Sequence, residues 1–237
     1  MNPILVALDV DRASTAQAMA DDLRGAVGGF KIGMQLFTSE GPDIVRRFVE
    51  RQDRVFLDLK FHDIPNTVEG AVAAATELGV WMVNVHAGGG RAMLEAARRG
   101  ADTAAARTGR PAPLVIAVTV LTSMSAEMLG QVGVASSPLE QVTRLARLTQ
   151  DAGLDGVVAS PQEIHAIRAA CGPDFAIVTP GIRGGAATSG PDDQARTATP
   201  AGAIAAGSSY LVIGRPITGA SDRRAAAIAI GREIAGT

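Results

Sequence analysis

Short apolar runs alternate with longer amphipathic or alanine-rich segments along the whole chain. Apolar runs bounded by glycine, proline and polar residues are typical of buried strands, whereas apolar positions that recur every three or four residues indicate helices. The eight predicted strands cover residues 4–10, 29–34, 54–60, 81–87, 114–120, 155–160, 175–180 and 210–216. The predicted helices that follow them cover residues 15–24, 42–51, 67–79, 91–105, 139–153, 162–172, 200–207 and 222–236.

Eight strand–helix units in succession predict a parallel sheet whose strands are joined by helical crossovers. Eight such units in 237 residues fit a closed (β/α)8 TIM barrel better than an open, doubly wound sheet. The sequence shows no linker, low-complexity tract or second core, so one α/β domain is expected over residues 1–237. An active site in this fold belongs at the C-terminal ends of the strands.

Composition and charge narrow the class of protein. The chain is 47% apolar, which is enough for a full core, and its net charge of −2 creates no field that favours nucleic acid or an anionic membrane. Cys171 is the only cysteine, so an intrachain disulfide is excluded. The N-terminus has no basic segment ahead of its apolar run, which argues against a signal peptide. These features predict a cytoplasmic protein with a small-molecule ligand.

Charged and polar residues gather where the predicted strands end. Because the C-terminal ends of parallel strands meet at one rim of a barrel, such residues are expected to line a common site. They are Asp9, Lys31, Asp58, Lys60, His86, Thr122, Arg183 and Arg215.

The stretch FLDLKFHDI (56–64) places three ionisable groups in an apolar run. Residues two apart in a strand share a face, so Asp58 and Lys60 are expected to point into the barrel mouth while the apolar residues face the helices. Asp63 breaks this alternation and is expected to project from the following loop. A single buried pair of this kind is open to a purely structural interpretation.

Two further charged residues favour a catalytic role for Asp58 and Lys60 over a purely structural one. Asp9 and Lys31 lie at the ends of neighbouring strands, so an alternating array of Asp9, Lys31, Asp58 and Lys60 is predicted. Lys31 and Lys60 are the only lysines among 22 basic residues. An arginine cannot release a proton near neutral pH, whereas a lysine ammonium can. At least one of the two lysines is therefore expected to donate a proton or to act as a compact point charge.

A second group of residues has the chemistry of a phosphate site. TPGIR and IGRP follow the seventh and eighth predicted strands, where barrels of this kind often hold phosphate. Gly181 and Gly214 permit close approach of the backbone, and Arg183 and Arg215 offer bidentate donors. The polar segment 184–200 between them is long enough to form a closing lid, with a plain solvated loop as the alternative.

Other candidates are weaker. His86 is either catalytic or a hydrogen-bonded spacer, and Thr122 and Ser123 either bind a ligand or cap a turn. The remaining histidines and Cys171 show no metal-ligand spacing, so no metal site is predicted.

DLKFHDIPNT (58–67) resembles the Asp-x-Lys-x-x-Asp-Ile-Pro-Asn-Thr signature of the orotidine 5′-phosphate decarboxylases, in their bacterial short form. ALDV, FKIGMQLF, VTVLTSM, TPGIR, DDQARTATP and VIGRPI are similar to other segments of that family, in the same order. The resemblance covers essentially the whole chain. It implies that orotidine 5′-monophosphate is converted to UMP in pyrimidine biosynthesis without a cofactor or metal.

The resemblance also implies roles for single residues. Lys60 is the general acid that protonates C6 of the pyrimidine, Asp58 lies against the substrate carboxylate, and Lys31 completes the array. Asp9 binds the ribose, and Thr122 contacts the pyrimidine. Asp63 and Thr67 reach the site of the partner chain in a homodimer. The residues that hold the phosphate and close the lid are Arg183, Gln194, Gly214 and Arg215.

Two alternatives stay open at this point. A Mg²⁺-dependent sugar-phosphate decarboxylase or aldolase of similar barrel architecture uses an acidic metal ligand at the end of the second strand, where this chain has Lys31. The second alternative is a non-catalytic barrel that binds a nucleotide. Such a protein does not need a lysine, rather than an arginine, between two aspartates.

Overall fold

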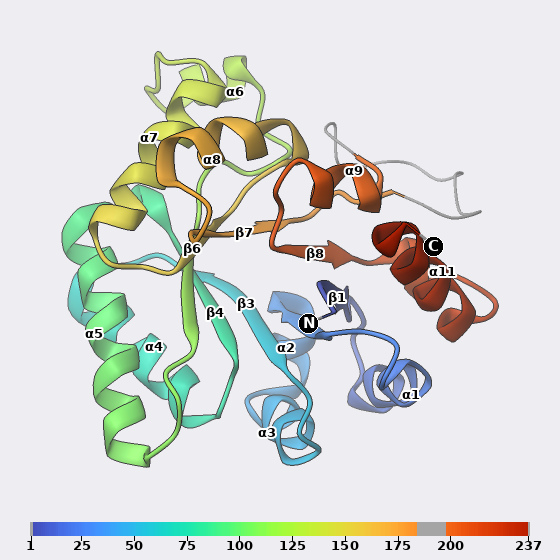
Figure 1. Ribbon diagram of the computed structural model, residues 1–237. Coiled ribbons are helices and arrows are strands. Elements are labelled where there is room, and N and C mark those ends of the chain that lie inside the picture. Colours follow the sequence, from blue (N-terminus) through green and yellow to red (C-terminus); the bar gives the residue numbers. More distant parts are fainter. Residues whose placement is uncertain (1, 184–197, 237) are drawn as a thin grey trace.

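A computed structural model describes residues 2–183 and 198–236 of the chain. It contains eight parallel strands that pair in sequence order and close into a barrel through β8 and β1 (Figure 1). The predicted (β/α)8 barrel is therefore confirmed. The strands are β1 Ile4–Ala7, β2 Gly29–Gly33, β3 Val55–Phe61, β4 Met82–His86, β5 Leu114–Val118, β6 Gly156–Val158, β7 Ala176–Thr179 and β8 Tyr210–Ile213.

Helices surround the barrel on its outside (Figure 1). All eight predicted helices are present: α1 Ala13–Leu23, α3 Asp43–Glu50, α4 Pro65–Glu77, α5 Gly90–Thr108, α7 Pro138–Asp151, α8 Ile164–Cys171, α9 Pro200–Ala205 and α11 Arg223–Ala235. Short elements between them had not been predicted: α2 Met34–Glu40, α6 Ala126–Gln131, α10 Arg215–Thr218 and the 3-10 turns η1 Ala87–Gly89 and η2 Pro161–Glu163. These elements are too short to display a helical period.

Local sequence explains where the helices begin. Ser137 caps α7, because its Oγ accepts the backbone N–H of Glu140 while the Glu140 carboxylate accepts the N–H of Ser137. Pro138 occupies the first helical turn, where its missing N–H costs nothing. Within the ranges 2–183 and 198–236, no helix has both the length and the apolar character required to cross a membrane.

The core has two parts. The larger lies between the strands and the helices and includes Leu57, Val83 and Ile213. The smaller fills the inside of the barrel, where Leu5, Phe56, Met82, Ile116 and Val178 pack together. This apolar plug closes the barrel interior beneath the C-terminal ends of the strands and forms a floor for whatever binds above it.

Strand β3 departs from a regular pleat at its charged residues. Leu57 pairs with Val83 and Phe61 pairs with Val85, so three residues of β3 lie opposite one residue of β4. Within this bulge Lys60 has a φ of +53°, in the left-handed region. The bulge inserts extra residues into the strand, yet the charges of Asp58 and Lys60 both face the mouth of the barrel, as the alternation predicted. The apolar residues Leu57, Leu59 and Phe61 pack in or against the outer core, also as predicted.

Candidate active site

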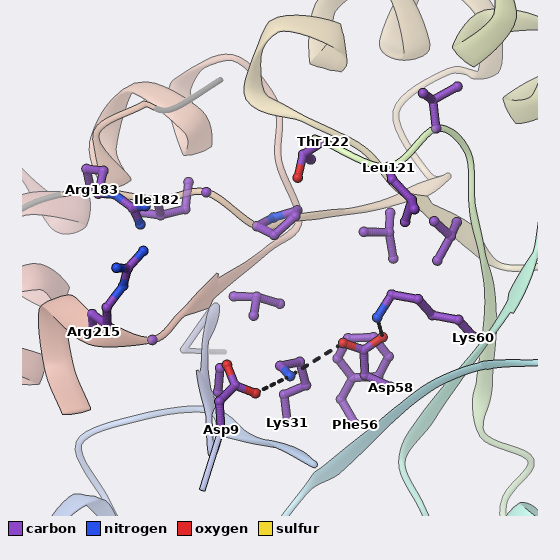
Figure 2. A pocket seen from close by; sticks show the side chains of 18 residues that line it. Asp9, Lys31, Phe56, Asp58, Lys60, Leu121, Thr122, Ile182, Arg183 and Arg215 are labelled. Carbon is purple, nitrogen blue, oxygen red and sulfur yellow. Dashed lines mark hydrogen bonds and ion pairs between the residues drawn. The ribbon is translucent and has the colours of Figure 1, made fainter. Parts of the chain in front are cut away.

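A cavity of about 270 Å³ opens at the C-terminal ends of the strands. Its floor includes Phe56 from the apolar plug, and charged or polar groups line its walls (Figure 2). The sequence-predicted residues that it brings together are Asp9, Lys31, Asp58, Lys60, Thr122, Gly181, Arg183, Gly214 and Arg215.

Four of these side chains form a continuous chain of ion pairs, called the charged array below. Lys31 Nζ lies 2.9 Å from Asp9 Oδ1 and 3.4 Å from Asp58 Oδ2. Lys60 Nζ lies 2.7 Å from Asp58 Oδ1 (Figure 2). The predicted alternating order Asp9, Lys31, Asp58, Lys60 is therefore confirmed as a physical chain of contacts.

Electrostatics keep the centre of the charged array ionised. Burial alone would raise the pKa of Asp58, but the ammonium groups of Lys31 and Lys60 outweigh it and hold that pKa below its ordinary value. Burial would likewise lower the pKa of Lys31, yet Asp58 and Asp9 outweigh it and hold that pKa above its ordinary value. Both groups are charged at neutral pH.

Accessibility differs along the charged array. The side chains of Lys31 and Asp58 are only 9% and 13% exposed, whereas that of Lys60 is 26% exposed. Lys60 is thus the more accessible of the two amines for a ligand in the cavity. Gly33 leaves room for the Lys31–Asp9 pair, since a Cβ at that position would lie 2.9 Å from Lys31 Nζ.

Asn84 is a residue of this region that the sequence reasoning missed. It is fully buried in the middle of β4, opposite the bulge of β3. Its Oδ1 accepts the backbone N–H of Lys60 at 2.8 Å, and its Nδ2 donates to Asp58 Oδ1 at 2.7 Å. The available signal was an amide side chain in the apolar strand MVNVH, where a polar group needs partners.

The phosphate-like residues lie across the cavity from Lys60. Figure 2 shows the guanidinium groups of Arg183 and Arg215 directed toward one another on the side away from Lys60. Gly181 has a φ of +77°, which disfavours any side chain there. Gln194 and almost all of the predicted lid 184–200 lie outside the described residues.

Asp63 and Thr67 lie outside the cavity that contains the charged array. Both are exposed, and Asp63 Oδ1 accepts the backbone N–H of Ile64 at 2.6 Å. Asp63 follows the end of β3, as the break in alternation predicted, and Thr67 lies in the first turn of α4.

The remaining polar candidates separate into different environments. Thr122 lines the cavity, whereas Ser123 lines a neighbouring surface depression. His86 is not among the cavity-lining residues, and its ring packs on that of His62 with centroids 5.4 Å apart. Burial, then the charges of His62 and Lys60, lowers the pKa of His86, so this imidazole is neutral at neutral pH.

The carboxylates of the charged array are paired with ammonium groups. Among the residues that the structure describes, no group of three or more histidine, cysteine, aspartate or glutamate side chains is placed to hold a metal ion. Within the charged array, the Lys31 ammonium lies between the carboxylates of Asp9 and Asp58.

A family model described as "Orotidine 5'-phosphate decarboxylase / HUMPS family" matches residues 2–230. The chain belongs to this family. The family that the signature DLKFHDIPNT indicated is therefore confirmed over nearly the full length of the chain.

Relatives within the family are close. The chain is 56% identical over 232 residues to an orotidine 5′-phosphate decarboxylase of Moorella thermoacetica, covering 98% of this chain and 91% of the relative. It is 55% identical to the enzyme of the same name from Chromobacterium violaceum, covering 98% and 92%. A crystal structure of orotidine 5′-phosphate decarboxylase from Lactobacillus acidophilus superimposes with a TM-score of 0.88 at 38% identity, covering 99% of each chain.

Proposed function

We propose that this protein decarboxylates orotidine 5′-monophosphate to UMP, a step of de novo pyrimidine biosynthesis. The observation that carries the proposal is the charged array, in which two lysines are held by carboxylates at one side of a cavity with an arginine pair at the other. The family and the names of its close relatives support the same reaction.

The chemistry needs a positive charge beside one carbon atom. When the bond between C6 and the carboxylate breaks, its electron pair stays on C6, a vinyl carbon with no adjacent group that accepts charge well. An ammonium held at that position stabilises charge that appears only in the transition state, which is what accelerates a reaction. Lys60 then transfers a proton from Nζ to C6, CO₂ leaves, and the neutral amine regains a proton from water.

The other members of the charged array have supporting roles in this proposal. Asp58 lies against the substrate carboxylate and anchors both ammonium groups. Lys31 balances the charge of Asp58 and, with Asp9, extends the array toward the ribose. No step requires a metal or an organic cofactor.

Binding of the phosphate is assigned to the opposite end of the cavity. Arg183, Gly214 and Arg215 would hold it, with Gln194 from the lid, and Thr122 would contact the pyrimidine. Contacts made far from the reacting carbon can hold the substrate in place and exclude water, which strengthens each charge at C6.

We also propose that the protein acts as a homodimer. Asp63 and Thr67 lie outside their own chain's cavity, and Ile64 between them leaves a large apolar side chain 66% exposed. The family resemblance assigns Asp63 and Thr67 to the site of the partner chain.

A cytoplasmic location fits the proposed role in nucleotide synthesis, with no nucleic acid or membrane partner.

A sugar-phosphate reaction that depends on Mg²⁺ is the alternative within related barrels. Lys31 argues against it, because its ammonium lies between Asp9 and Asp58 and would repel a divalent cation. The two reactions are distinguished by following the absorbance of orotidine monophosphate with and without EDTA. We expect consumption of the substrate at the same rate in both cases, and a rate abolished by EDTA would favour the metal-dependent reaction.

The role of Lys60 is tested with two variants. Lys60→Ala is expected to bind UMP but to lose turnover by about 10²- to 10⁴-fold, the usual contribution of a positioned general acid. Lys60→Arg keeps the charge but holds its proton too tightly to deliver it, so its turnover is also expected to fall. Turnover and UMP affinity are measured on the same preparations. Wild-type turnover in Lys60→Ala would show that the proton comes from another group.

A further inference from the structure

Asn84 reaches both ends of the β3 bulge, Asp58 and Lys60, with one side chain. The residues from Asp58 to Lys60 lie opposite this single residue of β4. A backbone N–H buried without an acceptor is costly, and the bulge interrupts the β3–β4 ladder that would otherwise supply one. Asn84 Oδ1 supplies that acceptor for Lys60 at 2.8 Å.

The same amide group fixes the carboxylate of Asp58. Asn84 Nδ2 donates to Asp58 Oδ1 at 2.7 Å, and this oxygen also accepts from Lys60 Nζ at 2.7 Å. The orientation of the amide is unambiguous, because the reversed orientation would place N–H against N–H and an oxygen against the carboxylate. An aspartate at this position would repel Asp58, and an aliphatic residue would satisfy neither partner.

Lys60 needs such support. A non-glycine residue with φ near +53° is in a conformation that L-residues avoid, and it persists only where surrounding contacts hold it. Asn84 is fully buried and is not among the residues that line the cavity. It therefore acts on the reaction through Lys60 and Asp58 rather than through contact with the substrate.

We infer that Asn84 is a positioning residue for the proposed decarboxylation, which sets the place of the Lys60 ammonium and the Asp58 carboxylate by bridging the β3 bulge. This inference rests on the proposed function. It predicts that changes at Asn84 lower the rate of the chemical step and leave binding of the nucleotide almost unchanged, since the arginine pair lies across the cavity.

The first test removes the bridge. Asn84→Ala is expected to lower kcat by about 10²-fold, the order of loss produced by a small misplacement of reacting groups, while KM and the affinity for UMP change little. Thr149→Val is the matched control, because Thr149 is also fully buried and donates a side-chain hydrogen bond, to Leu145 O on α7. The control is expected to lose stability but to keep wild-type kcat.

The second test uses a readout that loss of packing alone would not change. Asn84→Asp keeps the shape and the acceptor for Lys60 but replaces the donor toward Asp58 with a second carboxylate. When that carboxylate is protonated, its O–H can donate to Asp58 as Nδ2 does. The ratio of kcat of Asn84→Asp to that of the wild type is therefore expected to rise as the pH is lowered from 8 to 6.

The outcomes separate the two proposals. Wild-type kcat in folded Asn84→Ala would overturn the inference, as would a raised KM with unchanged kcat. If Asn84→Ala does not fold, the inference is tested with Asn84→Asp alone. A ratio of its kcat to that of the wild type that is constant with pH would then count against the inference. A wild-type protein that leaves orotidine monophosphate unchanged would instead refute the proposed function itself.

Discussion

At the scale of single residues, the charge on each group depends on its neighbours in the charged array. Asp58 is placed between two amines, so its carboxylate is favoured over the protonated form despite its burial. Lys31 has the complementary environment, with a carboxylate on each side. The result is an ammonium at Lys60 that is anchored on one side by Asp58 and remains accessible on the other.

This arrangement has a consequence for stability at low pH. The folded-state pKa of Asp58 lies below its unfolded value of about 3.9, so its contribution to stability is present above about pH 5 and is lost as the pH falls through the folded pKa. Lys31 has a raised pKa, so its contribution is present below about pH 10 and is lost as the pH rises through the folded pKa. Neither contribution changes near neutral pH.

We therefore expect Asp58→Asn to lower the free energy of unfolding at pH 7 by about 2 kcal/mol, less than for a fully enclosed pair because Lys60 keeps access to water. The difference from the wild type should shrink when unfolding by urea is measured at pH 3. Glu95→Gln removes an exposed pair with Arg91 and serves as the control, with a change of at most about 0.5 kcal/mol at both pH values. A difference for Asp58→Asn that does not vary with pH would contradict the assigned pKa.

Single residues also show where sequence reasoning succeeds. Asp58 and Lys60 were predicted because their neighbours in the chain form an apolar strand in which charges are conspicuous. Asn84 was not, because its partners belong to another strand and the bulge that brings them together is a property of the pairing between β3 and β4. Gly33 was missed for a similar reason, since its significance lies in its distance from the Lys31 ammonium.

At the scale of elements, every strand except β3 is shorter than the apolar run that predicted it. The first run was predicted to extend to residue 10, but β1 ends at Ala7 and Asp9 lies beyond it. Leu8, just past β1, still donates its backbone N–H to Lys31 O at 3.0 Å, whereas the Asp9 side chain lines the cavity. Periodicity identifies an element, whereas its end depends on hydrogen bonds to neighbouring strands.

The contact between α4 and α5 is a second element-scale feature. Gly100 in α5 is buried, and a Cβ at this position would lie 2.3 Å from the backbone oxygen of Glu69 in α4. The two helices can approach this closely only because the residue has no side chain. Thr67 lies one turn or less from this contact, in the first turn of α4.

We expect Gly100→Ala to lower the free energy of unfolding by about 1 to 3 kcal/mol, the usual cost of overpacking, because backbone atoms must move to make room. Gly231→Ala in α11 is the control, since a Cβ there meets nothing within 4 Å. Alanine favours helix over glycine, so this control should be neutral or more stable by up to about 1 kcal/mol. Thermal and urea unfolding of both variants measure the difference, and equal stability of the two would contradict the close packing.

At the scale of the whole molecule, closure of the barrel brings distant segments to one cavity. Asp9 follows β1 and Arg215 begins α10, yet both line it because β8 pairs with β1. The apolar plug fills the barrel interior beneath the cavity, which opens at the C-terminal ends of the strands. The charged array and the arginine pair thus face one another across a distance set by the barrel and not by any local motif.

The proposed homodimer is a prediction at this scale. Ile64→Glu places a charge at a side chain that is 66% exposed beside Asp63, and we expect it to shift the protein toward monomers in sedimentation experiments and to reduce turnover in parallel. Val132→Glu is the matched control, since Val132 in the segment after α6 is 65% exposed, and it should leave the mass and the activity unchanged. A wild-type protein that is monomeric and fully active at nanomolar concentration would contradict the shared site.

The sequence by itself determined the order of strands and helices, the closed barrel, the family and the identity of most charged groups at the strand ends. These features follow from local periodicity and from motifs of consecutive residues, both of which can be recognised in the sequence alone. Only the tertiary structure decided the bulge in β3, the left-handed conformation of Lys60 and the bridge through Asn84. Those depend on how two strands shift against each other, and that shift is set by packing and hydrogen bonds between residues far apart in the sequence.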